Sequence, residues 1–161
     1  MSGKTPTRQE ALDLVLQYNE TDSLVNHAKA VEAAMRYMAR RTGADEEMLG
    51  AIGLVHDLDY EKFPAEHCHK TEAILRENDW PEDYIRAVLS HGWGICTDIE
   101  PQSLVEKTLY TVDELAGFVS ACALVRPSKS VQDLEVKSVK KKWKQKSFAA
   151  GVDREVVARG M

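Results

Sequence analysis

Imidazole and carboxylate side chains recur in this sequence where helical spacing directs them inward, as it would direct the ligands of a buried cation. His27 shares a predicted stripe with apolar residues four, seven and eleven positions later, and His56 follows apolar residues at helical spacing. His91 comes at the end of another predicted helix, and Asp113 interrupts an apolar stripe. An isolated buried carboxylate is costly, so it must be paired, hydrogen-bonded or bound to a metal.

The adjacent pair His56-Asp57 lies in the segment LVHDLDYEKF at residues 54–63. Either the pair ends a helix and faces water, or it offers a nitrogen and an oxygen to one cation. A carboxylate such as Asp113 can also cap a helix or pair with an arginine. Several inward imidazoles and carboxylates would satisfy one another best around a cation. Mixed nitrogen and oxygen ligands suit divalent iron, manganese, zinc, nickel or cobalt.

The elements that must position these side chains are predicted to be helices. Periodicity, capping residues and a stop at Gly43 predict helices over 7–19, 21–43, 45–60, 66–79, 81–91 and 103–125. Ser130 and Asp133, at a capping-box-like spacing, open a further segment, and 153–161 is expected to form a short last helix. No segment alternates cleanly enough to predict a strand. The expected fold is all-α, a compact helical bundle.

Length and composition are those of one globular domain. The chain has 161 residues with 43% hydrophobic and 29% charged side chains, so we expect a single domain over 1–161. The net charge of -5 argues against nucleic-acid binding through overall charge. The sequence lacks a signal-like apolar core and a membrane-length apolar run, so a cytoplasmic protein with no membrane contact is expected. The sequence leaves the oligomeric state open.

The cysteines Cys68, Cys96 and Cys122 show no metal-binding or disulfide spacing. An odd number of cysteines without a CxxC motif favours a reducing compartment. Packing roles are the expected ones, and no serine or cysteine nucleophile is indicated.

The order His27, His56-Asp57, Asp113 resembles the HD-domain superfamily of metal-dependent phosphohydrolases. HCHKTEAIL is similar to the superfamily's His-x-x-x-Gly-x-x-Ile-Leu segment, and IRAVLSH to the helix that carries a further ligand in its two-metal members. The resemblance covers about 22–125, and the whole chain is similar to small bacterial HD or HDIG-type hydrolases of unassigned substrate. It implies that these four residues hold one metal.

The resemblance also implies a second metal, which Asp57 bridges and which His67 and His91 hold. His67 lies four residues before Thr71, which fits the superfamily spacing, whereas His69 points roughly 200° away around the helix. The sequence therefore favours His67 as the ligand. Thr71 stands in place of the expected glycine.

The chemistry that such a site implies is attack by a water whose pKa the metal lowers. Asp57 is expected at the reacting centre, and Asp59 or Glu61 could shuttle a proton or orient a ligand. The alternative for Asp59 and Glu61 is that they are solvated loop acids.

The C-terminal extension 126–161 is densely basic. Its cationic side chains could bind the phosphate of a substrate, although a solvated helical face is the alternative. The candidates are Arg126, Lys137, Lys140, Lys141 and Lys144.

The leading functional prediction is a metal-dependent phosphohydrolase that acts on a small phosphorylated molecule, such as a nucleotide. Similar ligands occur in di-iron HD oxygenases that cleave C–C or C–P bonds, which gives a second prediction. A non-catalytic metal-binding sensor or scaffold is a third. Nucleic-acid binding through the lysine run is the weakest alternative.

Overall fold

The computed structural model describes residues 4–161, and in this part of the chain the secondary structure is helical apart from one isolated bridge between Trp93 and Thr97. The prediction of an all-α fold is confirmed. The elements in chain order are α1 (Arg8–Tyr18), α2 (Asp22–Thr42), α3 (Glu46–Val55), η1 (Pro64–Glu66), α4 (His69–Glu77), α5 (Glu82–Ser90), α6 (Leu104–Leu124), α7 (Val136–Trp143) and α8 (Arg154–Gly160). No helix within 4–161 is both long and apolar enough to cross a membrane.

Local capping explains where several helices begin and end. Thr7 and Ser103 each form a capping box at the starts of α1 and α6, in which the side-chain oxygen accepts the N–H of the glutamate three residues later. Asp45 caps α3 by accepting the N–H of Met48. Gly43 ends α2 in the left-handed conformation, with φ of 73°, which glycine adopts readily.

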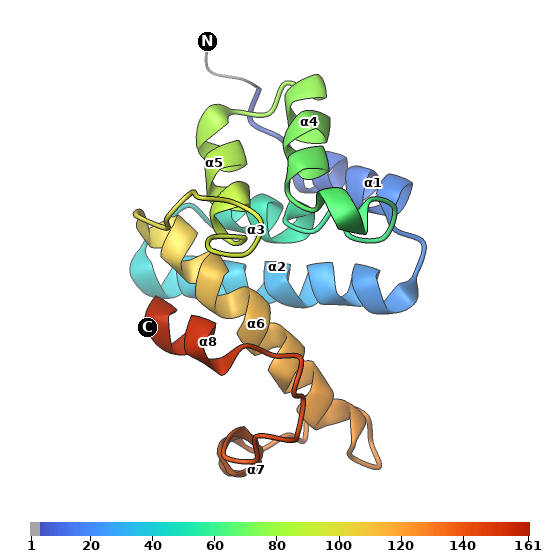
Figure 1. Ribbon diagram of the computed structural model, residues 1–161, viewed down its shortest axis with the longest axis vertical. Coiled ribbons are helices and arrows are strands. Elements are labelled where there is room, and N and C mark those ends of the chain that lie inside the picture. The colour runs from blue at the N-terminus through green and yellow to red at the C-terminus, as the bar shows by residue number, and fades with distance from the viewer. Residues whose placement is uncertain (1–3) are drawn as a thin grey trace.

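Two long helices form the frame of the domain. α2 packs along α3 and crosses α6, while α1 covers α3 and the α4–α5 pair lies beyond it (Figure 1). The core where these helices meet is apolar and closed to solvent, with Val31, Met35 and Ile52 fully buried. Because α2, α3 and α6 converge there, polar side chains on their facing surfaces must meet.

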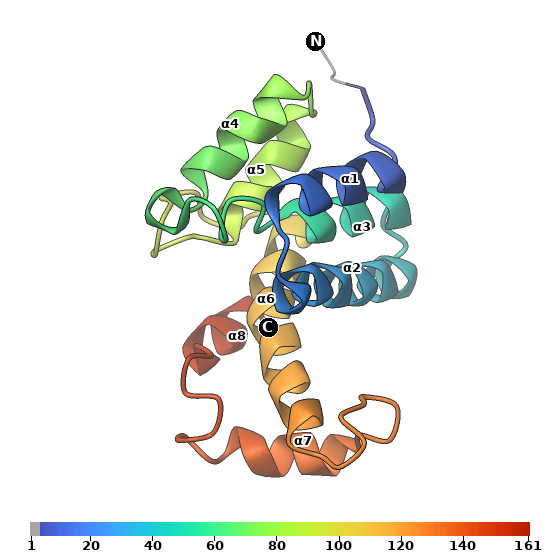
Figure 2. The same cartoon turned by 90° about the vertical axis from the view of Figure 1, so that its right-hand side faces the viewer.

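The C-terminal extension packs on the distal half of α6. Figure 2 shows α7 at the end of α6 opposite α4 and α5, with α8 returning along α6. Phe118 anchors this part, because its ring lies 4.9 Å from that of Trp143 and 5.7 Å from that of Phe148. The guanidinium of Arg154 stacks over Phe118 and Trp143.

Three predicted boundaries were wrong. The helix expected over 66–79 begins only at His69, so His67 lies outside it and helical spacing does not set its direction relative to His69. The segment 45–60 leaves the helical conformation after Val55, which places Asp57 on a turn. Ser130 does not open a helix either, since α7 begins at Val136. Asp133 instead accepts hydrogen bonds from Arg126 and Ser128, which fold the preceding loop onto the end of α6.

Candidate metal centre

Four of the predicted ligands come together from three helices. His27 lies on the second turn of α2, His56 closes α3, Asp57 follows it on the turn, and Asp113 lies in the middle of α6. One donor atom from each lies within 4.8 Å of the donor atoms of the other three. Side chains separated by up to 86 positions in sequence therefore form one compact group.

The distances in this first group are those of donors that surround a common point. His27 Nε2 lies 2.9 Å from Asp113 Oδ1 and 3.8 Å from Asp57 Oδ2. His56 Nε2 lies 3.2 Å from Asp57 Oδ2 and 3.3 Å from Asp113 Oδ1. Two imidazole nitrogens and two carboxylate oxygens thus face one another without an intervening side chain.

The other carboxylate oxygen of Asp57 faces a second group. His91 Nε2 lies 3.3 Å from Asp57 Oδ1, and His67 Nε2 lies 3.6 Å from the same oxygen. His67 follows η1 and His91 closes α5, so the turn carrying Asp57 lies between the frame and the α4–α5 pair. His69, in contrast, is exposed at the start of α4 and is not in this group.

Hydrogen bonds on the far side of three imidazoles fix which nitrogen faces each group. His56 Nδ1 lies 2.8 Å from the carbonyl oxygen of Gly53, and His91 Nδ1 contacts the carbonyl oxygen of Val88. His67 Nδ1 lies 2.7 Å from Asp59 Oδ1. Because a carbonyl or carboxylate accepts the Nδ1–H, each Nε2 presents a lone pair to the centre, which is the arrangement of metal-ligating histidines.

The carboxylates of Asp57 and Asp113 in the centre need a positive counter-charge. Burial opposes ionisation of both His56 and Asp57, yet their mutual attraction outweighs it. The neighbouring carboxylates of Asp57 and Asp113 raise the pKa of His56 well above its usual value, while His56 and His91 hold the pKa of Asp57 well below its own. The carboxylates thus stay ionised and require either imidazolium protons or a cation as counter-charge.

The residues fit a divalent cation. His56 Nε2 is buried and has no hydrogen-bond partner among the described residues, although two carboxylates face it. Such an orphaned buried lone pair is costly unless a cation or proton satisfies it. Two imidazoles and two carboxylates in the first group suit a divalent transition metal, and the His67, His91 and Asp57 group suits another.

Of the two acids predicted to assist, the structure places one beside the centre and one away from it. Asp59 is fully buried, and its carboxylate accepts from His67 and from the backbone N–H of Thr71. The hydroxyl of Thr71, where the family pattern has glycine, accepts the N–H of Asp59 in return. Glu61 instead accepts hydrogen bonds from Thr21 and tethers the start of α2.

A cavity of about 390 Å³ opens over the centre. Its floor carries His27, Asp57, His67, His91 and Asp113, and the remaining lining is formed by Leu24, Tyr60, Gly92, Ile95, Cys96, Glu114, Gly117 and Val152. This volume falls within the range of about 300–1,000 Å³ that is usual for small-molecule sites.

Sequence reasoning missed Glu114 and Tyr60. Glu114 follows the predicted ligand Asp113 on α6. Burial, and next the charge of Asp113, raise the pKa of Glu114 against the opposing hydrogen bond from the Asp153 N–H. Tyr60 packs its ring edge-on against that of His67 at 5.3 Å. Position in the sequence could have marked both residues, because Glu114 follows the predicted ligand Asp113 and Tyr60 follows the candidate acid Asp59.

The basic candidates lie elsewhere. Among residues 4–161, no lysine or arginine lines the metal-centre cavity. Arg126 pairs with Asp133 at 2.9 Å and lines a separate pocket with Lys141, at the far end of α6. The others, Lys137, Lys140 and Lys144, are exposed on α7 or at its C-terminal end. The expected electropositive cover over the metal centre is therefore absent from this part of the chain.

Comparison with known proteins identifies the class. Residues 24–117 match the HD domain, which spans more than half of the chain and includes the residues of both ligand groups. The chain therefore belongs to the HD-domain family, a superfamily of metal-dependent hydrolases that bind divalent metals, as its sequence resemblance implied.

A curated relative is the tRNA (cytidine(56)-2'-O)-methyltransferase of Thermoplasma volcanium, which is 38% identical over 112 residues. The match covers 65% of this chain but only 33% of that protein, so the chain spans about a third of the relative's length. No solved structure matches the chain significantly.

Proposed function

We propose that this protein is a metal-dependent phosphohydrolase that acts on a small, singly phosphorylated molecule. The observation that carries the proposal is the orientation of the Asp57 carboxylate, because its Oδ2 faces His56 and its Oδ1 faces His91. Asp57 would thereby help to hold two cations, one with each group of side chains, at the floor of an open cavity. A divalent cation pair there would supply an activated water and neutralise the charge of a phosphoryl group.

The chain's own residues would orient the reactants and move protons. Asp59, buried behind His67, fixes the ring so that Nε2 faces the centre. Glu114 lines the cavity, and burial raises the pKa of its carboxyl, which favours the protonated form that a proton donor to a leaving oxygen needs. Leu24 and Ile95 provide apolar walls for the organic part of the substrate.

The lining supports a substrate with a single phosphate. No lysine or arginine of the described chain reaches the cavity, so a cation pair would be the main source of positive charge for the substrate. A di- or triphosphate would bring more negative charge than two cations surrounded by Asp57 and Asp113 can balance. A nucleoside monophosphate is such a substrate, and the volume of the cavity, about 390 Å³, is within the usual range for small-molecule sites. The name of the relative, which concerns tRNA, is in keeping with a nucleotide substrate.

The experiment is a substrate panel with metal-stripped protein reloaded separately with Mn²⁺, Co²⁺, Ni²⁺, Zn²⁺ or Fe²⁺. Phosphate release from nucleoside monophosphates, with Asp57→Asn inactive and Glu61→Gln active, is the expected result. Glu61 is the matched control because it contacts Thr21 and does not line the cavity. Turnover in Asp57→Asn equal to that of wild type would refute the proposal.

The same preparation separates phosphohydrolysis from oxygenase chemistry. A phosphohydrolase releases phosphate without oxygen and with redox-inert Zn²⁺ or Ni²⁺ as well as with iron. Oxygen consumption that requires iron, together with no phosphate release by any loaded form, would favour the di-iron oxygenase instead.

A further inference from the structure

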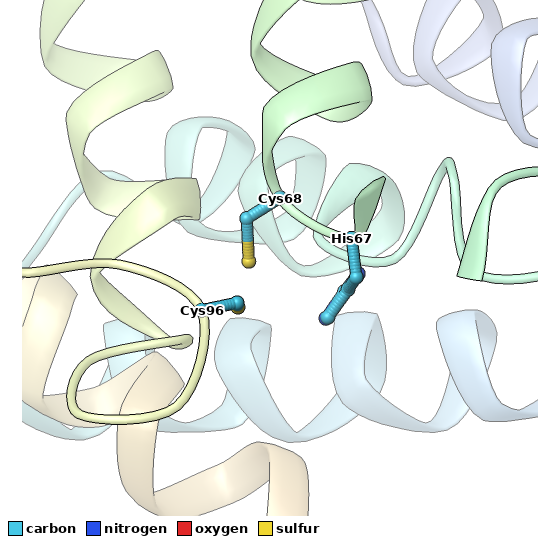
Figure 3. Close-up of side chains that lie close together, drawn as sticks. All are labelled: His67, Cys68 and Cys96. Atoms are coloured by element: carbon cyan, nitrogen blue, oxygen red, sulfur yellow. The ribbon is translucent and has the colours of Figure 1, made fainter. Parts of the chain in front are cut away.

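A second set of ligating side chains adjoins the metal centre. His67, Cys68 and Cys96 converge so that one donor atom from each lies within 4.8 Å of the other two (Figure 3). Cys68 immediately precedes α4, and Cys96 lies on the loop that follows α5. Neither cysteine belongs to the nitrogen and oxygen donors described above.

The fold makes room for the two thiols to meet. A methyl group at Gly92 would lie 2.3 Å from Cys96 Sγ and 2.6 Å from Cys68 Sγ, so only glycine leaves both sulfurs in place. Cys68 is fully buried and has φ of 70°, a conformation that residues other than glycine seldom adopt. Cys96 is partly exposed and lines the cavity, which gives the buried pair a route to solvent.

We propose that His67, Cys68 and Cys96 form a binding site for a thiophilic divalent cation such as Zn²⁺ or Cd²⁺. One imidazole nitrogen and two sulfurs form a ligand set that zinc takes in proteins, with water in the remaining tetrahedral position. Binding converts both thiols to thiolates and releases two protons to solvent. The carboxylate of Asp59, bound to His67 Nδ1, adds negative charge beside the site.

The site shares one ligand with the metal centre. Because Nδ1 of His67 is held by Asp59, only Nε2 has a lone pair for a cation, and it can bind one cation at a time. A cation on Cys68 and Cys96 therefore withdraws His67 from Asp57 and His91. Thiophilic ions should therefore inhibit the enzyme, and this expected inhibition rests on the proposed function. The existence of the cation site does not depend on that function.

Cobalt is the probe, because Co²⁺ bound to thiolate shows a near-ultraviolet charge-transfer absorption that nitrogen and oxygen ligands lack. Reduced, metal-stripped, full-length protein is titrated with Co²⁺. We expect the thiolate absorption to appear in wild type and in Cys122→Ser, the matched control on α6, and to be lost in Cys96→Ser. In Asp57→Asn, which disables the competing position, the absorption should appear at lower Co²⁺ concentration.

Cys96→Ser carries the test because the side chain is partly exposed and on a loop, and circular dichroism verifies its fold. Absence of thiolate absorption from wild type, or its persistence unchanged in Cys96→Ser, would overturn the proposal. Thiolate absorption together with inactivity towards every phosphoester would leave the cation site standing and remove the proposed function, so the two failures are distinguishable.

Discussion

Replacing Asp57 by asparagine tests the centre most directly. The substitution preserves the shape of the side chain and removes its charge. Asp57 Oδ2 contacts the first group and Oδ1 the second, so the variant weakens both cation positions at once. The prediction is that stabilisation of the fold by Mn²⁺, which prefers oxygen and nitrogen ligands to thiolates, disappears in the variant.

The magnitude follows from binding linkage. A cation that binds only the folded chain adds about 2.7 kcal/mol at 100 times its Kd and about 4.1 kcal/mol at 1,000 times its Kd. For a domain of this length, each kcal/mol shifts Tm by about 2–4 °C. Metal should therefore raise the Tm of the wild-type protein by about 5–16 °C.

Scanning calorimetry of EDTA-treated and Mn²⁺-loaded samples measures this difference. The matched control is Asp79→Asn, because Asp79 is exposed and its φ of 57° suits asparagine equally well. We expect the metal-induced rise to persist in Asp79→Asn and to fall below about 2 °C in Asp57→Asn. An undiminished rise in Asp57→Asn would show that metal binds elsewhere, and no rise in wild type would show that the centre binds none.

Three further outcomes are expected. Neighbouring carboxylates raise the pKa of His56, so its protonation stabilises the metal-free fold fully below the usual value of 6.5 and is lost at higher pH. The Tm of EDTA-treated protein should therefore fall as the pH rises above 6.5, whereas the metal-induced rise in Tm should grow over the same change. Asp59→Asn loosens His67, so metal affinity at the second position should fall roughly 10–100-fold in metal-binding titrations while the first position is retained. Gly92→Ala should lower the free energy of unfolding by about 1–3 kcal/mol in urea titrations, whereas Gly151→Ala, which meets no atom within 4 Å, should change it little.

Much of the candidate centre was predictable because most of its candidate ligands lie on, or close, regular helices. His27 and Asp113 occupy inward positions of α2 and α6, so helical periodicity alone indicates their direction. His56 and His91 close α3 and α5, where a helix still sets the direction of the side chain. The sequence resemblance then supplied the grouping of these side chains around shared metal positions, which periodicity does not contain.

Residues outside regular helices could not be placed in the same way. His67 is held by Asp59, and Cys68 meets Cys96 over Gly92, through loop conformations that depend on tertiary contacts. The lysines of the C-terminal extension show that a regular helix can also mislead. They lie on α7 or at its end, but α7 packs through Phe118 on the distal half of α6, away from the metal centre.

Charge alone therefore cannot assign those lysines to the substrate. An electropositive segment serves an anionic substrate only if the fold brings it to the reacting centre, and here packing of aromatic side chains takes it elsewhere. In the proposed function, the positive charge that a phosphoryl group needs must then come from cations at the floor of the cavity. That requirement links the ionised Asp57 and Asp113 to function, because two fixed carboxylates beside a substrate anion would repel it unless cations lay between them.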